Sequence, residues 1–284
     1  MRGADKQIWR LITYSEHDAA TNMAIDEAVL ETHAIGLTPP TVRLYCFAPA
    51  AVTIGFGQKM AATEIARIRR EGFDIVRRPT GGRAVLHADD LTYSFVGNSA
   101  GAKNEGEATV HELGEFRWSP FLSPTINGAY KEICRGLIDA LRALSVQAEL
   151  GACDAAYRQL HDCFLATTTA DLHVNGRKII GSAQLRRNGY VLQHGSILLN
   201  QDQQLMHYLL TGEHSEQERH ANLFEAASKR FTKEQLQESI KGGFETAFGC
   251  RLVVGELTER ERLLAQELRQ KYLLPASDAA PVTA

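Results

Sequence analysis

The stretch that decides the fold is residues 171–199, which reads DLHVNGRKIIGSAQLRRNGYVLQHGSILL. The dipeptide Asn-Gly occurs twice in it, each time between alternating runs of polar and apolar residues. Asn-Gly between such runs is the strongest short-range signal for a two-residue hairpin turn, because the turn needs positive φ at both central residues. The stretch therefore predicts a three-stranded antiparallel meander, with strands over residues 171–174, 177–186 and 190–199.

The middle strand of this meander begins with a lysine. Successive side chains of a strand point to opposite faces, so every second residue from Lys178 to Gln184 is expected to share one face. Cys163 lies fifteen residues before the lysine, in a polar, threonine-rich stretch. A nearby ammonium group favours the nucleophilic thiolate form of cysteine, so the pair predicts covalent acyl chemistry. The plainer interpretation is an inert buried thiol and a solvated lysine.

Upstream of the meander, helical and strand patterns alternate along the chain. Residues 18–35 and 123–145 carry apolar residues at helical spacing, and Ser123-Pro124 is a favourable helix start. Short alternating runs predict further strands. These strands cover residues 9–14, 41–47, 51–54, 74–78, 84–87, 91–96 and 146–150, with a short helix over 63–71.

From residue 201 on the pattern is helical. The expected helices are 204–210, 232–248 and 258–272. We therefore expect a β-rich body over residues 1–212, a helical extension over 213–274 and a disordered Ala/Pro-rich tail over 275–284. Residues 98–123 show no periodicity, which is typical of a functional lid or of plain disorder.

The composition is that of an ordinary globular protein. The 284 residues are 44% hydrophobic and 23% charged, and the formal net charge of −3 argues against general nucleic-acid binding. No apolar run approaches the roughly 20 residues of a membrane span. The polar N-terminus lacks the apolar core of a signal peptide, so a cytoplasmic location is expected. The five scattered cysteines contain no Cys-x-x-Cys pair and predict neither a zinc site nor a disulfide framework.

Residues 77–83 read RRPTGGR and lie between two predicted strands. Glycine lets the backbone approach a ligand closely, so the amides of Gly81 and Gly82 and the flanking arginines are candidates to hold an anionic or carbonyl oxygen. The alternative is an ordinary tight turn. His87 is a candidate for proton transfer, although a histidine at a strand end is more often structural, and the case for His194 is weaker still.

Six segments match one family of proteins in the expected order, across about residues 9–212. They are residues 22–28 (NMAIDEA), 43–45 (RLY), 77–87 (RRPTGGRAVLH), 91–94 (LTYS), 176–184 (GRKIIGSAQ) and 193–198 (QHGSIL). On these motifs the chain resembles the lipoate–protein ligase, octanoyltransferase and biotin–protein ligase superfamily. Within this superfamily the chain most resembles the octanoyltransferase that acts on the glycine-cleavage H protein, because Cys163-Phe164 stands fifteen residues before the motif lysine.

The resemblance implies an α/β (α+β) fold, with a mixed, largely antiparallel sheet flanked by helices. It implies that octanoyl moves from octanoyl-acyl carrier protein, through a thioester on Cys163, to a lysine of a lipoyl domain, that of the glycine-cleavage H protein. Lys178 would favour the thiolate and orient the acyl carbonyl. No cofactor, metal, nucleic acid or membrane is expected, and the protein is expected to be a monomer. The implied substrate-binding residues are Arg78, Thr80, Gly81, Gly82, His87, Gly181 and Ser182.

Two physical features should accompany this activity. The octanoyl chain needs an apolar slot, whose burial of eight carbons would contribute about 5 kcal/mol. The carrier domains are acidic, so a basic rim is expected despite the negative total charge. The candidates for this rim are Arg77, Arg78, Arg83, Arg186 and Arg187.

Three other functions fit the same motifs. An ATP-dependent lipoate–protein ligase would hold an acyl-adenylate with Lys178 and the glycine loop, leaving Cys163 incidental. A non-catalytic subunit would bind lipoyl domains without forming an acyl-enzyme. A biotin–protein ligase fits the fold, but the expected Gly-Arg-Gly-Arg-type loop is replaced by RRPTGGR.

Overall fold

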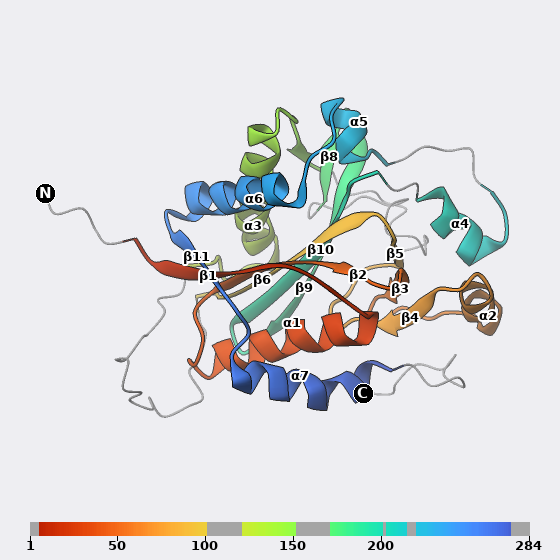
Figure 1. The fold of residues 1–284 in the computed structure, drawn as a ribbon, viewed down its shortest axis with the longest axis horizontal. Helices are drawn as coiled ribbons and strands as arrows, with labels where there is room; N and C mark the ends of the chain where they lie inside the picture. The colour runs from red at the N-terminus through yellow and green to blue at the C-terminus, as the bar shows by residue number, and fades with distance from the viewer. Residues whose placement is uncertain (1–5, 101–120, 152–170, 201–202, 215–219, 274–284) are drawn as a thin grey trace, which may run out of the picture.

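The computed structural model describes residues 6–100, 121–151, 171–200, 203–214 and 220–273. Its centre is an eight-stranded sheet in the order β11-β1-β2-β6-β10-β9-β8-β7 (Figure 1). Strand β1 pairs in parallel with β11 and β2, and the remaining pairs are antiparallel. The strands are β1 (Ile8–His17), β2 (Thr41–Phe47), β6 (Asp90–Asn98), β7 (Glu149–Leu150), β8 (Leu172–Val174), β9 (Arg177–Arg187), β10 (Tyr190–Leu198) and β11 (Arg251–Gly255). The mixed, largely antiparallel sheet is confirmed.

The two Asn-Gly turns form as predicted. Asn175 and Gly176 have φ of 51° and 75°, and Asn188 and Gly189 have φ of 51° and 85°. Positive φ at both central residues twists the turn in the same sense as its strands. Strands β8, β9 and β10 accordingly form the expected meander.

A β-bulge at the start of β9 changes which way the lysine points. Leu172 of β8 lies opposite Ile180, but the next residue, His173, lies opposite Lys178, so β9 carries one extra residue. Ile179 and Ile180 both enter the apolar core, and Lys178 lines a cavity instead. The prediction that Lys178 shares a face with Ile180 is therefore wrong, because a bulge interrupts the alternation of side chains.

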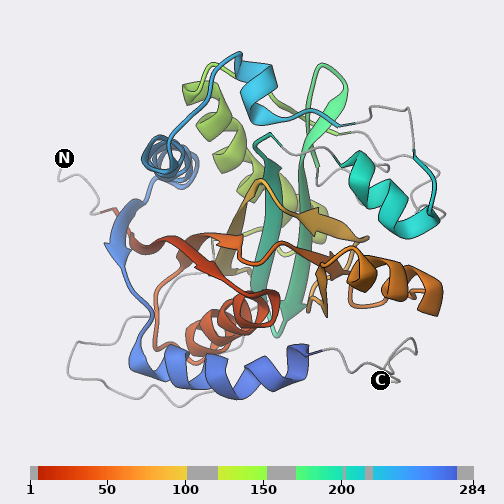
Figure 2. The ribbon, with the colours of Figure 1, turned by 45° about the vertical axis from the view of Figure 1, so that its right-hand side comes forward.

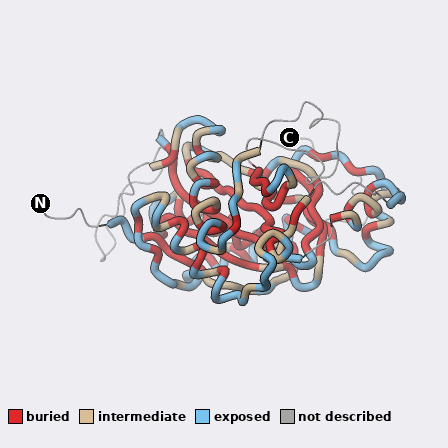
Figure 3. The backbone as a smooth tube through the Cα atoms, turned by 90° about the horizontal axis from the view of Figure 1, so that it is seen from above, coloured by how far each residue is buried: buried red, intermediate tan, exposed pale blue. Residues whose placement is uncertain are grey.

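Two pairs of helices cover the two faces of the sheet (Figure 2). On one face α3 (Ile126–Ala143) packs against α6 (Lys233–Phe248), over a core that includes Trp9 and Phe95. On the other face α1 (Ala19–Ala34) packs against α7 (Glu259–Tyr272). Figure 3 shows the buried positions running through the middle of the molecule.

The start of α3 differs from the prediction. Thr125 is the N-cap, and its hydroxyl accepts a hydrogen bond from the Gly128 amide at 3.1 Å. The predicted cap was Ser123, two residues earlier. Its backbone amide is bound to the Glu132 carboxylate at 2.7 Å instead.

A second, three-stranded sheet stands at one end of the molecule, at the right of Figure 1. Its order is β4-β3-β5, with β4 (Asp74–Arg77), β3 (Ala51–Ile54) and β5 (Val85–His87). Helices α2 (Ala62–Arg70) and α4 (Gln204–Thr211) close its core. Arg67 of α2 donates to the carbonyls of Leu209 and Leu210 at 3.0 and 2.8 Å, so it joins the two helices at the end of α4.

The part of the chain beyond residue 212 is not purely helical. It contains α5 (Leu223–Ala227), α6 and α7, but also β11, which joins the main sheet beside β1. A buried ion pair holds α7 to β1, because Arg10 contacts both carboxylate oxygens of Glu261 at 2.5 and 2.8 Å. The division into a 1–212 catalytic domain and a 213–274 extension stays a prediction.

Other expectations fall partly outside the described residues. These include most of the predicted 98–123 loop and all of the 275–284 tail. Among the helices that the structure describes, none has the length and apolar character needed to cross a membrane.

Candidate active site

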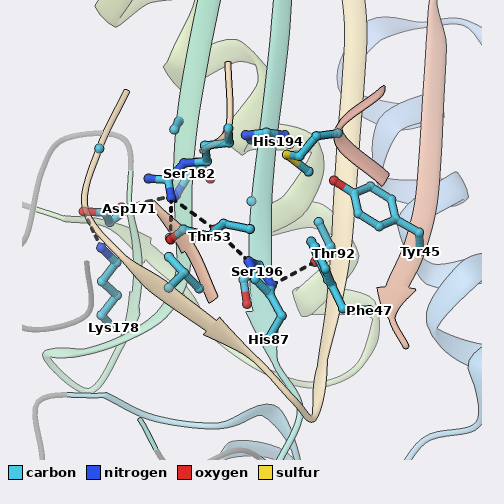
Figure 4. Close-up of a pocket in the computed structure, with 17 residues that line it drawn as sticks. Tyr45, Phe47, Thr53, His87, Thr92, Asp171, Lys178, Ser182, His194 and Ser196 are labelled. Atoms are coloured by element: carbon cyan, nitrogen blue, oxygen red, sulfur yellow. Dashed lines mark hydrogen bonds and ion pairs between the residues drawn. The ribbon is translucent and has the colours of Figure 1, made fainter. Parts of the chain in front are cut away.

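A cavity lies between the two sheets (Figure 4). Strands β3 and β5 of the small sheet form one wall, and β2, β6, β9 and β10 of the main sheet form the other. Its apolar lining comes mainly from Met23, Tyr45, Phe47 and Val85. The polar lining residues are Thr53, Arg78, His87, Thr92, Asp171, Lys178, Ser182, His194 and Ser196, and Gly82, Gly181, Ala183 and Gly195 complete it.

Lys178 is buried in this wall with a carboxylate beside it. Its Nζ lies 3.0 Å from Oδ2 of Asp171, and the two side chains are 1% and 2% exposed. Asp171 also accepts a hydrogen bond from the Ser182 amide, at 3.4 Å. A buried charge is tolerated when it is paired and hydrogen-bonded. Lys178 therefore reaches the cavity as one half of an ion pair, rather than as the isolated positive charge that the sequence suggested.

A second network connects α1, the glycine turn and β10. His194 lies with Nδ1 3.0 Å from Asp26 and Nε2 2.6 Å from the Thr80 hydroxyl. Arg43 and Tyr45 also donate to Asp26, both at 2.8 Å. All five side chains are buried. A cluster this enclosed and this fully bonded holds its members in one arrangement.

The protonation states in this network follow from burial and charge. Burial alone would raise the pKa of the Asp26 carboxyl, but the His194 hydrogen bond and the Arg43 charge hold it below its ordinary value. Burial lowers the pKa of His194, against the opposing effect of Asp26. Near neutral pH, Asp26 is therefore ionised and His194 neutral. Because a carboxylate only accepts, Nδ1 of His194 donates to Asp26, and its Nε2 accepts from the Thr80 hydroxyl.

The glycine turn after β4 is held from inside by Arg78. The buried guanidinium donates to the carbonyls of Gly81 at 2.8 Å, Arg83 at 2.7 Å and Thr53 at 3.2 Å. Gly82 has a φ of +92°, and a Cβ there would lie 2.7 Å from Nη2 of Arg78. Glycine is needed at this position both for its backbone conformation and for the space.

His87 lines the cavity with both ring nitrogens engaged. Nδ1 lies 2.8 Å from the Asp90 carboxylate and Nε2 lies 3.0 Å from the Thr53 hydroxyl. The ring stacks on Phe47 with centroids 4.0 Å apart. These contacts favour the structural interpretation of His87 over proton transfer, because no nitrogen is left to face a substrate.

The structure brings most of the predicted site residues to this one cavity. Those that line it are Arg78, Gly82, His87, Lys178, Gly181 and Ser182. Thr80 is buried behind the lining, against His194, and Gly81 is exposed on the turn. Cys163 lies outside the described residues, so its predicted role stays a prediction.

The predicted basic rim is wrong at one end. Arg186 and Arg187 lie at the opposite end of β9 from Lys178. Arg186 donates to Ser99 at 2.9 Å, and Arg187 pairs with Glu31. Both arginines make local contacts away from the cavity, because β9 is too long for both of its ends to border one cavity.

Sequence reasoning missed two acidic members of the site and undervalued a histidine. Asp171 was read only as the start of a strand, although it lies beside the lysine across a predicted hairpin. Asp26 and His194 are 168 positions apart, and each stands in a matched segment. The available signal for Asp26 was its place in the matched segment NMAIDEA, although Glu27 beside it carries the same charge.

The fold agrees with the comparisons to known proteins. The chain belongs to the family described as the lipoyl protein ligase A/B catalytic domain, whose pattern matches residues 18–105 and 102–245. Octanoyltransferase LipM of Kyrpidia tusciae is 34% identical over 283 residues, covering 94% of this chain and 97% of that protein. The LipM of Symbiobacterium thermophilum is 36% identical over 276 residues, covering 92% and 93%. Within the family, the chain is an octanoyltransferase of lipoate biosynthesis.

Solved structures support the fold. Protein Ta0514 from T. acidophilum, solved with bound lipoic acid, superposes with a TM-score of 0.72 at 24% identity, covering 93% of this chain and 96% of that one. A lipoate-protein ligase A bound with ATP superposes with a TM-score of 0.70 at 22% identity, covering 94% and 95%. At these identities the likeness shows a shared fold alone, and it confirms the lipoate-ligase type of sheet.

Proposed function

We propose that this octanoyltransferase takes its acyl group from octanoyl-acyl carrier protein, holds it as a thioester on Cys163 and passes it to a lysine of a lipoyl domain, that of the glycine-cleavage H protein. The observation that carries the proposal is Lys178, a buried lysine on the wall of a largely apolar cavity, paired with Asp171. Cys163 precedes it by fifteen residues. The relatives named above are octanoyltransferases, and none of the proposed steps needs ATP.

The cavity suits an acyl chain. Met23, Tyr45, Phe47 and Val85 supply an apolar lining and are at most 7% exposed. Each methylene that such walls remove from water contributes roughly 0.8 kcal/mol. The polar lining includes Lys178, whose ammonium could donate a hydrogen bond to the carbonyl of a bound acyl group.

The chemistry balances as two acyl transfers. The Cys163 thiolate attacks the thioester carbonyl of the donor, a carbon–sulfur bond to Cys163 forms, the carbon–sulfur bond to the carrier breaks, and the carrier leaves as its thiolate. The lysine amine of the lipoyl domain then attacks the same carbon, an amide bond forms, and the Cys163 sulfur leaves and takes up the proton. Lys178 donates to the carbonyl oxygen as negative charge develops on it, and Asp171 keeps the ammonium in position.

The test is intact mass spectrometry of the protein mixed with octanoyl-acyl carrier protein, without ATP. An octanoyl adduct is expected on the wild type, absent from Cys163→Ala, and discharged by apo H protein. Cys134→Ala serves as the control for loss of a thiol, because Cys134 is fully buried in the main core.

The alternatives give different outcomes in the same experiment. Transfer that appears only with free octanoate and ATP, and that survives Cys163→Ala, would establish the ligase mechanism. Binding of the lipoyl domain with no transfer from either donor would identify a non-catalytic subunit. We also propose that the protein acts as a monomer, which light scattering would check.

A further inference from the structure

The loop between β3 and α2 exposes a phenylalanine directly beside the active site. Phe56 is 63% exposed, the most of any large apolar side chain that the structure describes. Its amide donates to the Thr80 carbonyl at 2.9 Å. A Cβ on Gly55 would overlap the carbonyl of Gly82, which lines the cavity. The loop is therefore packed against the glycine turn at the cavity wall.

This loop is rigid although it projects from the surface. One guanidinium nitrogen of Arg77 binds the carbonyls of Gly55, Phe56 and Gln58, at 2.9, 3.0 and 2.7 Å. The Gln58 side chain is buried and accepts from the Gly55 amide at 3.3 Å. A preformed loop presents an aromatic side chain at a lower entropic cost than a mobile one. Single exposed apolar residues are common, but this one stands on a loop that is hydrogen-bonded in place at the border of the active site.

The segment that carries Phe56, residues 55–83, is basic, in contrast to the rest of the chain. Residues 55–83 contain seven arginines and lysines against three acidic residues, whereas the whole chain has a net charge of −3. Lys59 is exposed three residues after Phe56, and Arg69 and Arg70 are exposed on α2. Positive charge around an aromatic anchor complements an acidic partner.

We propose that Phe56 and Lys59 form the docking point for the acidic acyl carrier protein that delivers the octanoyl group. The carrier would cover Phe56 and place its acidic surface on Lys59 and the other exposed basic residues of 55–83, with its thioester arm entering the cavity past the Gly81–Gly82 turn. The inference rests on the proposed function, because it assumes a carrier-bound donor. It assigns the donor to this loop by charge, since the carrier is acidic and residues 55–83 carry a net positive charge.

The test compares two octanoyl donors in single-turnover acylation, octanoyl-acyl carrier protein and octanoyl-pantetheine. Phe56→Ala and Lys59→Glu are each expected to raise the half-saturating concentration of the carrier about tenfold or more. Both variants should react with octanoyl-pantetheine as the wild type does, because the small thioester needs no docking surface. The Lys59 effect should shrink as ionic strength rises.

Matched controls are available far from this loop. Leu263→Ala removes an apolar side chain that is 49% exposed on α7, and Lys131→Glu reverses an exposed charge on α3. Neither should change the use of either donor.

Three results would overturn the proposal. Unchanged carrier kinetics in both variants would remove the docking point. A defect confined to the apo H protein, measured by discharge of a preformed acyl-enzyme, would mean that the acceptor docks here instead. Equal losses with carrier and octanoyl-pantetheine would show that the loop only shapes the cavity. Failure of the proposed function itself looks different, because the wild type would then accept octanoyl from neither donor.

Discussion

Replacing Asp171 with asparagine should destabilise the protein strongly, although the two side chains have nearly the same shape. The change leaves the Lys178 ammonium 1% exposed with its carboxylate partner gone. At the observed 3.0 Å and an effective dielectric constant of about 20, the lost attraction is about 5 kcal/mol. Removing one partner of a buried ion pair costs roughly 3–5 kcal/mol in proteins, so we expect a loss of that size.

The assay is urea unfolding at pH 7, with the free energy of unfolding obtained by linear extrapolation. The double variant Asp171→Asn/Lys178→Met should recover much of the loss, because it removes the unpaired charge. Octanoyl transfer should fall in Asp171→Asn even where the protein is folded, since Lys178 loses the group that positions it. A loss below about 1 kcal/mol, with no recovery in the double variant, would refute the view of a buried, mutually dependent pair.

Three further predictions concern pH, backbone and cavity size. Burial lowers the pKa of His33 to about 4, so between about pH 6.5 and 4 this histidine is protonated in the unfolded chain but not in the folded one. The free energy of unfolding should therefore fall by about 3 kcal/mol on acidification through that window. His33→Gln should flatten this part of a plot of the urea midpoint against pH. Gly82→Ala should cost more than about 1 kcal/mol in chemical denaturation and slow transfer, because its φ is +92° and the Cβ meets Arg78. Met23→Ala should cost about 2–5 kcal/mol and shift the acyl preference from octanoyl toward decanoyl in a competition assay, since Met23 is buried on the cavity wall.

The sequence by itself determined the local elements of this protein. The two Asn-Gly turns specify their hairpins because the turn depends on the conformations of two adjacent residues. Helices α6 and α7 were predicted over 232–248 and 258–272 and form over Lys233–Phe248 and Glu259–Tyr272, with Thr232 and Thr258 as N-caps. Apolar spacing and cap residues are read within a few positions, so no tertiary contact is needed to find them. The motifs also pointed to the family and to the cavity.

Tertiary structure decided what faces the cavity. The bulge that turns Lys178 away from the core arises from the pairing of β9 with β8. The sequence of β9 alone looks like that of an ordinary strand. Asp26, Thr80 and His194 lie on three separate segments and meet only when α1, the glycine turn and β10 pack together. Strand β11 was missed because it gains its hydrogen bonds from β1, more than two hundred residues away in the chain. The motifs predicted most of the residues that line the candidate site, but contacts between distant segments leave no periodic pattern, so its charge pairing required the fold.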